Sequence, residues 1–217
     1  MCSNRFLLSL LIIFGLSASV AFGQNLTFFF DIEKGSISKV SAKIKTNNTN
    51  LEQRNHLGDT AVIVAARNGQ LEILRLLVEN GANINALDSK KRDVLNIAIS
   101  TRNPALAQLA LQLGADPTMV TSVYDGGAII YGSAKGAVEI VEMLIKAGAP
   151  VNRINNLGWT ALLEVAILGN NSKEYIAIAQ MLIAAGADRS IKDNEGKTAF
   201  DHAKDRGNHE LAKILAF

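Results

Sequence analysis

Three histidines, His56, His202 and His209, are the side chains of this chain best suited to acid–base or metal chemistry. His202 and His209 have Asp201 and Glu210 as sequence neighbours, and imidazole and carboxylate groups together can bind zinc. We expect these residues to be solvated side chains instead, because they stand on the polar side of the last two predicted helices. The sequence therefore predicts no metal site.

Other catalytic arrangements are missing from the sequence. No glycine-rich phosphate loop follows a strand, and no nucleophile elbow or carboxylate pair stands in a recognisable setting. The one cysteine, Cys2, lies in a segment that we expect to be removed, so the mature chain has no disulfide, cysteine zinc ligand or cysteine nucleophile. The chain is predicted to be no enzyme, with no catalytic residue, metal or cofactor.

The opening segment, residues 1–23, has the features of a cleaved secretory signal peptide. Arg5 precedes an apolar run over residues 6–16, and residues 21–23 (AFG) form a small-x-small cleavage pattern before Gln24. The run is short for a bilayer-spanning helix, and no basic stop-transfer cluster follows it. A retained anchor is the alternative. We expect an exported protein, periplasmic or secreted, with no membrane span after signal cleavage.

The charge balance favours neither a nucleic acid nor a membrane surface as a partner. The chain has 22 basic and 20 acidic side chains, which gives a formal net charge of +2 at pH 7. Removing Arg5 with the signal lowers this to +1. A protein that neutralises phosphate groups usually carries a clear basic excess. We therefore expect no nucleic acid partner.

The elements that must position any functional residue repeat along the chain. A helix-ending glycine recurs in the strings NGAN, LGAD, AGAP and AGAD, as Gly81, Gly114, Gly148 and Gly186. A helix-starting position recurs as Thr60, Asp93, Gly127, Thr160 and Thr198, at spacings of 33, 34, 33 and 38 residues. Spacings of this size are typical of stacked repeats.

The stretch from Gly58 to Asp88 gives the plan of one unit. Thr60 is expected to cap a short helix over residues 61–66, because its hydroxyl can accept a bond from an unpaired amide. A second, amphipathic helix is expected over residues 71–79, with Gly81 at its end. The unit is predicted to be a helical hairpin followed by an extended connection.

The motif G-x-T-x-L-x-x-A-x-x-x-G followed by L-L-x-x-G-A-[DN]-x-N resembles the ankyrin repeat. The resemblance covers roughly residues 26–217 and implies an all-α solenoid of about six stacked helix-turn-helix units with short β-hairpin-like loops. The implied domain is 24–217, with repeats at about 26–55, 56–88, 89–121, 122–155, 156–193 and 194–217. The predicted core includes Val62, Leu95, Ile129, Leu162 and Phe200, with Leu77, Leu144, Leu182 and Leu215.

Three departures from the pattern carry expectations of their own. The proline and histidine of the family's TPLH segment are absent, so we expect packing to replace the hydrogen bonds that the histidine makes between neighbouring turns. In the degraded first repeat, Phe28 to Phe30 are expected to pack under the second repeat, or to remain partly exposed. In the fifth repeat, the interval from Gly169 to Gly186 is longer, which lengthens a loop or adds a helical turn.

Ankyrin-like stacks expose a groove of hairpin tips and first-helix surfaces, which the family generally uses to bind proteins. In this sequence, aromatic and aliphatic residues gather on the tips and first helix of repeats four and five, beside a basic tip in repeat three. Such a composition is common in binding hot spots. The predicted partner-binding residues are Leu57, Lys90, Lys91, Arg92, Tyr124, Leu157, Trp159, Ile167 and Leu168. The alternative is that Trp159 folds back on its own hairpin.

The sequence thus leaves two classes of function open. The first is an exported, non-enzymatic module that captures a protein partner of unknown identity in the groove. Such a module would inhibit or support an exported enzyme or toxin. The second is a structural protein that self-associates at an envelope surface, through the end formed by Phe28 to Phe30.

Overall fold

The computed structural model describes residues 26–46 and 49–216, and the chain forms two compact units that divide between Ala82 and Asn83. The predicted signal peptide lies outside the described residues. Across these two ranges the elements are helices and turns, and β pairing is limited to the isolated bridges Arg54–Thr60 and Lys192–Thr198. None of the described helices is both long enough and apolar enough to cross a bilayer. The predicted all-α fold is confirmed.

The first unit contains two helical pairs. Residues 26–33 are helical and are followed by α2 (Ile37–Lys45), and the second pair is α3 (Ala61–Arg67) with α4 (Leu71–Glu79). Phe28 and Phe29 are buried with their rings 5.9 Å apart, edge to face, whereas Phe30 is 53% exposed. The expected packing of the phenylalanines therefore holds for two of the three.

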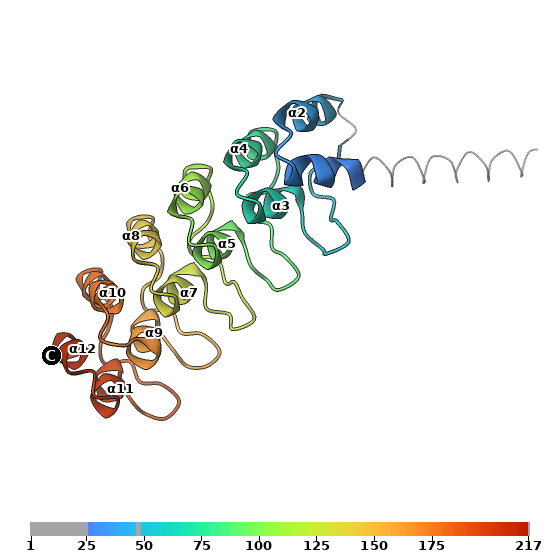
Figure 1. Ribbon diagram of the computed structural model, residues 1–217. Coiled ribbons are helices and arrows are strands. Elements are labelled where there is room, and N and C mark those ends of the chain that lie inside the picture. The colour runs from blue at the N-terminus through green and yellow to red at the C-terminus, as the bar shows by residue number, and fades with distance from the viewer. Residues whose placement is uncertain (1–25, 47–48, 217) are drawn as a thin grey trace, which may run out of the picture. The chain divides into compact units, whose positions relative to one another are not determined.

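The second unit contains four helical pairs that stack in two rows. They are α5 (Val94–Ser100) with α6 (Pro104–Gln112), α7 (Ala128–Ala134) with α8 (Val138–Lys146), α9 (Ala161–Leu168) with α10 (Lys173–Ala184), and α11 (Ala199–Asp205) with α12 (His209–Leu215). First helices pack on first helices and second helices on second helices, and the connecting hairpins extend beyond the first-helix row (Figure 1).

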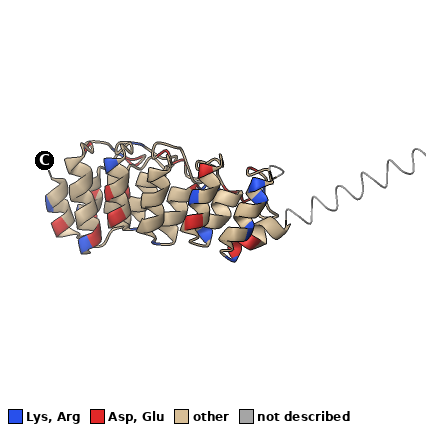
Figure 2. Ribbon diagram, turned by 90° about the horizontal axis from the view of Figure 1, so that it is seen from above, with Lys and Arg blue, Asp and Glu red and all other residues tan. Residues whose placement is uncertain are grey.

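Charges of both signs are spread over the second-helix row of this unit. Helix α6 has no charged side chain, whereas α8, α10 and α12 each carry acidic and basic residues (Figure 2). The second-helix row of this unit therefore forms neither a continuous acidic nor a continuous basic surface.

The helix ends follow the repeat, although the caps are not identical. Asp93, Thr160 and Thr198 stand at N-caps and accept a hydrogen bond from the backbone amide three residues on, at 2.7, 3.2 and 3.2 Å. The same prediction is wrong for Thr60, whose buried hydroxyl has no hydrogen-bond partner among the described residues. Gly81 has φ +95°, and its amide and that of the next residue bond back into α4, which closes the helix as predicted.

The predicted core residues are almost all buried. Val62 and Leu77 in the first unit, and Leu95, Ile129, Leu144, Leu162, Leu182 and Leu215 in the second, are at most 1% exposed. Phe200 is the exception, because it is only partly buried. It belongs to the last described helical pair, which packs on a neighbouring pair on one side only.

The extra residues of the fifth repeat lengthen its second helix. Helix α10 has 12 residues, against nine in α6 and in α8. The Tyr175 hydroxyl in its added turn donates a hydrogen bond to the Ala134 carbonyl at 3.0 Å. The extra turn therefore contacts the preceding repeat. Of the two alternatives left open by the sequence, an added helical turn is the main one observed.

Neighbouring hairpins of the second unit are joined by hydrogen bonds from asparagine. The Asn156 amide side chain donates to the Val123 carbonyl at 3.1 Å, and its backbone amide donates to Tyr124 at 2.9 Å. Asn194 donates in the same way to Leu157 at 3.0 Å. The expectation that packing alone would tie the turns together is therefore wrong.

The N-cap Asp93 should lower stability at neutral pH. Burial raises the pKa of its carboxyl group to about 6, although backbone amides donate hydrogen bonds to it. The folded chain then binds this proton more tightly than the unfolded chain, so stability falls as pH rises from about 4 to about 6. We expect Asp93→Thr to raise the free energy of unfolding at pH 7.5 by about 1–3 kcal/mol, measured by urea denaturation.

The pH dependence of stability separates the cost of burying the Asp93 charge from any difference between Asp and Thr as helix caps. The gain from Asp93→Thr should shrink as the pH is lowered toward 4. The control Thr160→Ala should lose about 1 kcal/mol at both pH values, because it removes an uncharged cap. An Asp93→Thr variant no more stable than the parent at pH 7.5 would contradict the assignment.

Candidate partner-binding surface

Three hairpins of the second unit are shaped by an Asn or Asp at their start, whereas in the hairpin over residues 121–127 Ser122 Oγ accepts one hydrogen bond, from the backbone amide of Tyr124 at 3.2 Å. Asn155 Oδ1 accepts hydrogen bonds from the backbone amides of Leu157 at 3.0 Å and Trp159 at 2.9 Å. Asp88 and Asp193 accept the equivalent pairs of bonds in their own hairpins. Such side-chain turns fix the backbone of a loop. The hairpin side chains are therefore presented from a defined backbone.

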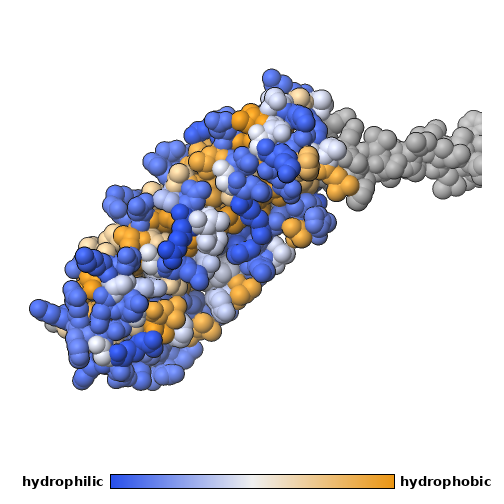
Figure 3. Space-filling view, in the orientation of Figure 1, coloured by the Kyte–Doolittle hydropathy of each residue, from blue (hydrophilic) through white to orange (hydrophobic). Residues whose placement is uncertain are grey.

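Two of the predicted residues lie exposed on consecutive hairpins that are hydrogen-bonded to each other. Tyr124 is 53% exposed and Leu157 is 40% exposed. Three further apolar residues of the same two hairpin segments, missed by the sequence analysis, are about half exposed: Val120, Val123 and Ile154. Apolar side chains interrupt the hydrophilic surface along the hairpin edge of the second unit (Figure 3). We call these five residues the hairpin patch.

Trp159 and Ile167 stand at positions whose equivalents touch in other repeats. Asp59 and Arg67 form an ion pair at 3.2 Å, and Lys197 and Asp205 form one at 2.9 Å, each over the same eight-residue interval. The indole and the isoleucine, both partly buried, therefore replace an ion pair between hairpin and first helix. This register supports the fold-back alternative for Trp159, and its binding role stays a prediction.

The remaining predicted residues are more scattered. Arg92 is bound to Asp88 of its own hairpin at 2.8 Å, and Lys91 pairs with Asp125 of the next hairpin at 3.5 Å. Lys90 is exposed, so the basic tip is only partly neutralised. Leu168, at the end of α9, is 51% exposed. Leu57 is 59% exposed and belongs to the first unit.

A buried carboxyl group lies beside the hairpin patch and was missed by the sequence analysis. Glu164 on α9 is 7% exposed, and its Oε1 accepts a hydrogen bond from Asn155 Nδ2 at 3.3 Å. Burial raises the pKa of Glu164 to about 7, against the lowering effects of Asn155 and Lys135. The sequence did carry a signal for Glu164, because the equivalent position of earlier repeats holds the apolar residues Val64 and Ile97.

The histidines are dispersed. His202 Nε2 lies 2.6 Å from Asp193 Oδ2, His209 is exposed, and His56 lies on the wall of a cavity in the first unit.

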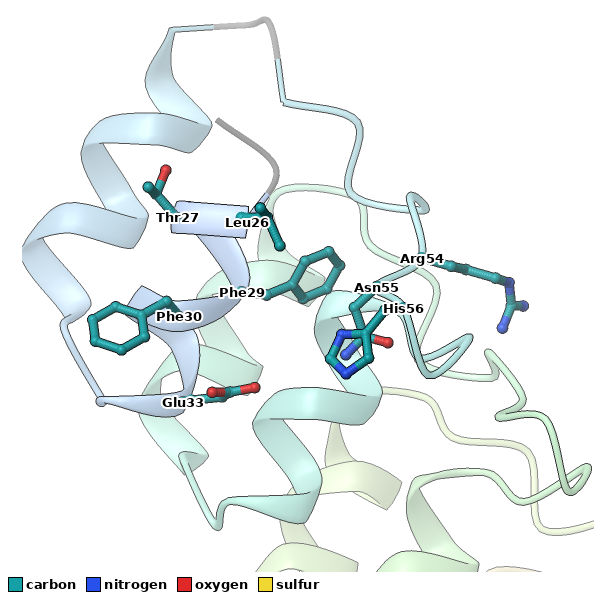
Figure 4. Close-up of a pocket in the computed structure, with 8 residues that line it drawn as sticks. All are labelled: Leu26, Thr27, Phe29, Phe30, Glu33, Arg54, Asn55 and His56. Atoms are coloured by element: carbon teal, nitrogen blue, oxygen red, sulfur yellow. The ribbon is translucent and has the colours of Figure 1, made fainter. Parts of the chain in front are cut away.

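The cavity beside His56 has a volume of about 600 Å³. It is lined by Leu26, Thr27, Phe29, Phe30, Glu33, Arg54, Asn55 and His56, with Phe29 directed toward His56 (Figure 4). In the part of the chain that the structure describes, no three His, Cys, Asp or Glu residues are grouped to hold a metal.

A family model for ankyrin repeats matches residues 29–121 and 128–217. The chain belongs to the ankyrin-repeat family. The family match indicates a protein-binding module, on a fold that generally serves as a non-enzymatic scaffold.

Similar proteins include several from bacteria. An ankyrin repeat domain from Acinetobacter baumannii AYE is 35% identical with a TM-score of 0.81, over 88% of this chain and 96% of that chain. The ankyrin repeat protein YahD of Escherichia coli K12 is 31% identical over 84% of this chain and 90% of YahD. A chain from the complex of the Bdellovibrio bacteriovorus endopeptidase Bd0816 with the immunity protein Bd3460 is 25% identical, with a TM-score of 0.72, over 87% of this chain and 95% of that chain.

Another relative is matched only in part. The alignment with glycerophosphocholine phosphodiesterase gde1 of Schizosaccharomyces pombe spans 45% of this chain and 8% of that protein, at 30% identity. The similarity therefore concerns a short segment of gde1 and not the length of the protein.

Replacing the buried carboxyl group should stabilise the chain at alkaline pH. Because the pKa of Glu164 is raised, stability falls as pH rises from about 4.5 to about 7. We expect Glu164→Gln to raise the free energy of unfolding at pH 8 by about 1 kcal/mol after solvent screening is allowed for, and to change little at pH 5. Thermal denaturation at the two pH values checks this, with the exposed Glu195→Gln as control. Equal stability of Glu164→Gln and parent at pH 8 would contradict it.

Proposed function

We propose that this chain is an exported, non-enzymatic protein-binding module that captures a protein partner on its hairpins and first helices. The localisation is periplasmic or secreted, in keeping with the opening segment of the sequence. The observation that carries the binding surface is the hairpin patch, where apolar side chains are exposed on adjacent hairpins held by hydrogen bonds. Exposed apolar groups on a defined backbone bind at a low cost in conformational entropy.

The similarity to a chain from an endopeptidase–immunity protein complex supports a more specific role. That complex joins a predatory endopeptidase to an immunity protein. By analogy, we propose that this chain binds an exported enzyme or toxin and inhibits it, or supports its activity.

Capture experiments with matched variants test the binding surface. The tagged full chain is used to capture proteins from the envelope fraction of its own organism, and bound proteins are identified by mass spectrometry. We expect a stoichiometric partner whose recovery falls at least about tenfold with Tyr124→Ala, Leu157→Ala or Trp159→Ala, since anchor residues each contribute about 1–2 kcal/mol or more. For Tyr124→Ala and Leu157→Ala the thermal midpoint should remain unchanged.

The control is Ile37→Ala, which alters an exposed apolar residue of the first unit. It should retain the partner. Equal recovery with all variants would exclude the hairpin patch. A large stability loss in Trp159→Ala would assign that residue to packing. If the chain recovers only its own copies, and these associate in a concentration-dependent way, the self-associating structural role is favoured instead.

Export is tested separately by intact mass. The chain, expressed from its native first residue in a bacterial host, should appear outside the cytoplasm with residues 1–23 removed. A chain of unchanged mass in the cytoplasm would contradict export.

A further inference from the structure

Glu164 is bound to the same side chain that shapes the hairpin beside it. Asn155 Nδ2 donates a hydrogen bond to the Glu164 carboxylate, and Asn155 Oδ1 accepts hydrogen bonds from the backbone amides of Leu157 and Trp159. The carboxyl group therefore lies next to the base of this hairpin, on the hairpin side of α9. Glu164 is only 7% exposed there, and the hairpin over residues 154–159 brings it a neutral amide from Asn155.

The charged groups around Glu164 leave its charge poorly compensated. On the α7 side, Lys135 acts on it from a distance, forms no ion pair with it among the described residues, and lies over the Tyr131 ring at 5.6 Å. On the α11 side, His202 is bound to Asp193. The hairpin over residues 154–159 has no charged residue.

The other element packed on α9 is α10. Its charged residues, Lys173 and Glu174, lie in the first turn. Glu174 lines a cavity with Arg102 and Lys135, at the connection between α7 and α8. Lys173 forms no ion pair with Glu164 in the described part of the chain, and Glu174, an acid, supplies no compensating charge.

The equivalent position in the next repeat shows what compensation looks like. His202 corresponds to Glu164, and Asp193 corresponds to Asn155. There, a group able to carry a positive charge meets an acid at 2.6 Å, whereas Glu164 meets only a neutral amide at 3.3 Å. A desolvated carboxylate without a cation is unfavourable by itself, and it gains strongly when a cation is brought to it.

We propose that Glu164 receives a lysine or arginine side chain of the protein partner, carried on an otherwise apolar segment that lies across the hairpin patch. This inference rests on the proposed function and names the chemistry of the partner. The aliphatic stem of the basic residue packs against Leu157 and Trp159 while its charged end reaches the carboxylate. An acidic segment at this place would be repelled.

The pairing has a definite pH dependence. A cation beside the carboxylate lowers the pKa of Glu164, so binding releases a proton when the free chain is protonated. The affinity should therefore rise as the pH is raised from about 5 to about 8. A partner that only covered Glu164 with apolar atoms would raise that pKa further, and its affinity would fall over the same range.

Peptides selected on the full chain provide the test. A random peptide library displayed on phage is selected at pH 8, and clones that lose binding to Tyr124→Ala or Leu157→Ala are kept. We expect these peptides to carry lysine or arginine between apolar residues. Calorimetry should show an affinity about 10- to 100-fold lower for Glu164→Gln at pH 8, because a charge-assisted bond is lost. Glu195→Gln is the matched control and should bind normally.

Direct titration of Glu164 by carboxyl carbon NMR completes the test. The pKa of Glu164 should fall when a selected peptide is bound. Peptides that need Tyr124 and Leu157 but lack basic residues, bind Glu164→Gln equally well, or raise the pKa would overturn this inference and leave the proposed function intact. If no selected peptide depends on Tyr124 or Leu157, the hairpin patch and this inference fail together. Since Glu164→Gln is expected to be the more stable chain, weaker binding would not reflect unfolding.

Discussion

The burial of one helical pair against the next is the constraint on which this structure depends. A pair of helices with seven to nine residues each cannot enclose its own apolar face, so the side chains at equivalent positions must meet across neighbouring pairs. In the second unit, Leu95, Ile129 and Leu162 occupy one such position and are almost completely buried. This requirement fixes the buried positions of each helical pair and leaves the hairpins free to vary in composition.

Three hairpins of the second unit share one backbone design, and the hairpin over residues 121–127 departs from it. An Asn or Asp at the start of a hairpin accepts two of its backbone amides, and in the second unit Asn156 and Asn194 reach back to the preceding hairpin. Hydrogen bonds from asparagine therefore take the place of those that the family's histidine usually makes between neighbouring turns. The backbone of Leu157 is held by Asn155 and Asn194, and that of Tyr124 by Ser122 and Asn156, so both side chains can remain exposed without collapsing onto the helices.

The buried carboxyl groups of Asp93 and Glu164 differ in how much their hydrogen bonds contribute to the fold. Asp93 is buried but caps α5, so its unfavourable burial is partly offset by a hydrogen bond to the helix. Glu164 forms one long hydrogen bond with a neutral amide. A carboxyl group that contributes little to the fold, next to exposed apolar side chains, is better explained by a partner than by folding. The proposed basic contact follows from this difference.

The sequence by itself determined the repeat, the helix-ending glycines, most of the buried positions and the exposure of Tyr124 and Leu157. These follow from local spacing and side-chain type, because each repeat makes the same contacts. Only the tertiary structure decided the missing bond of Thr60, the partial exposure of Phe200, the added turn of α10, the asparagine ties and the burial of Glu164. Each of these depends on distances between residues of different elements or on what covers a residue from the next pair. Such distances are set by packing; the sequence marks Glu164 and the longer fifth repeat as departures from the pattern, but not how the fold accommodates them.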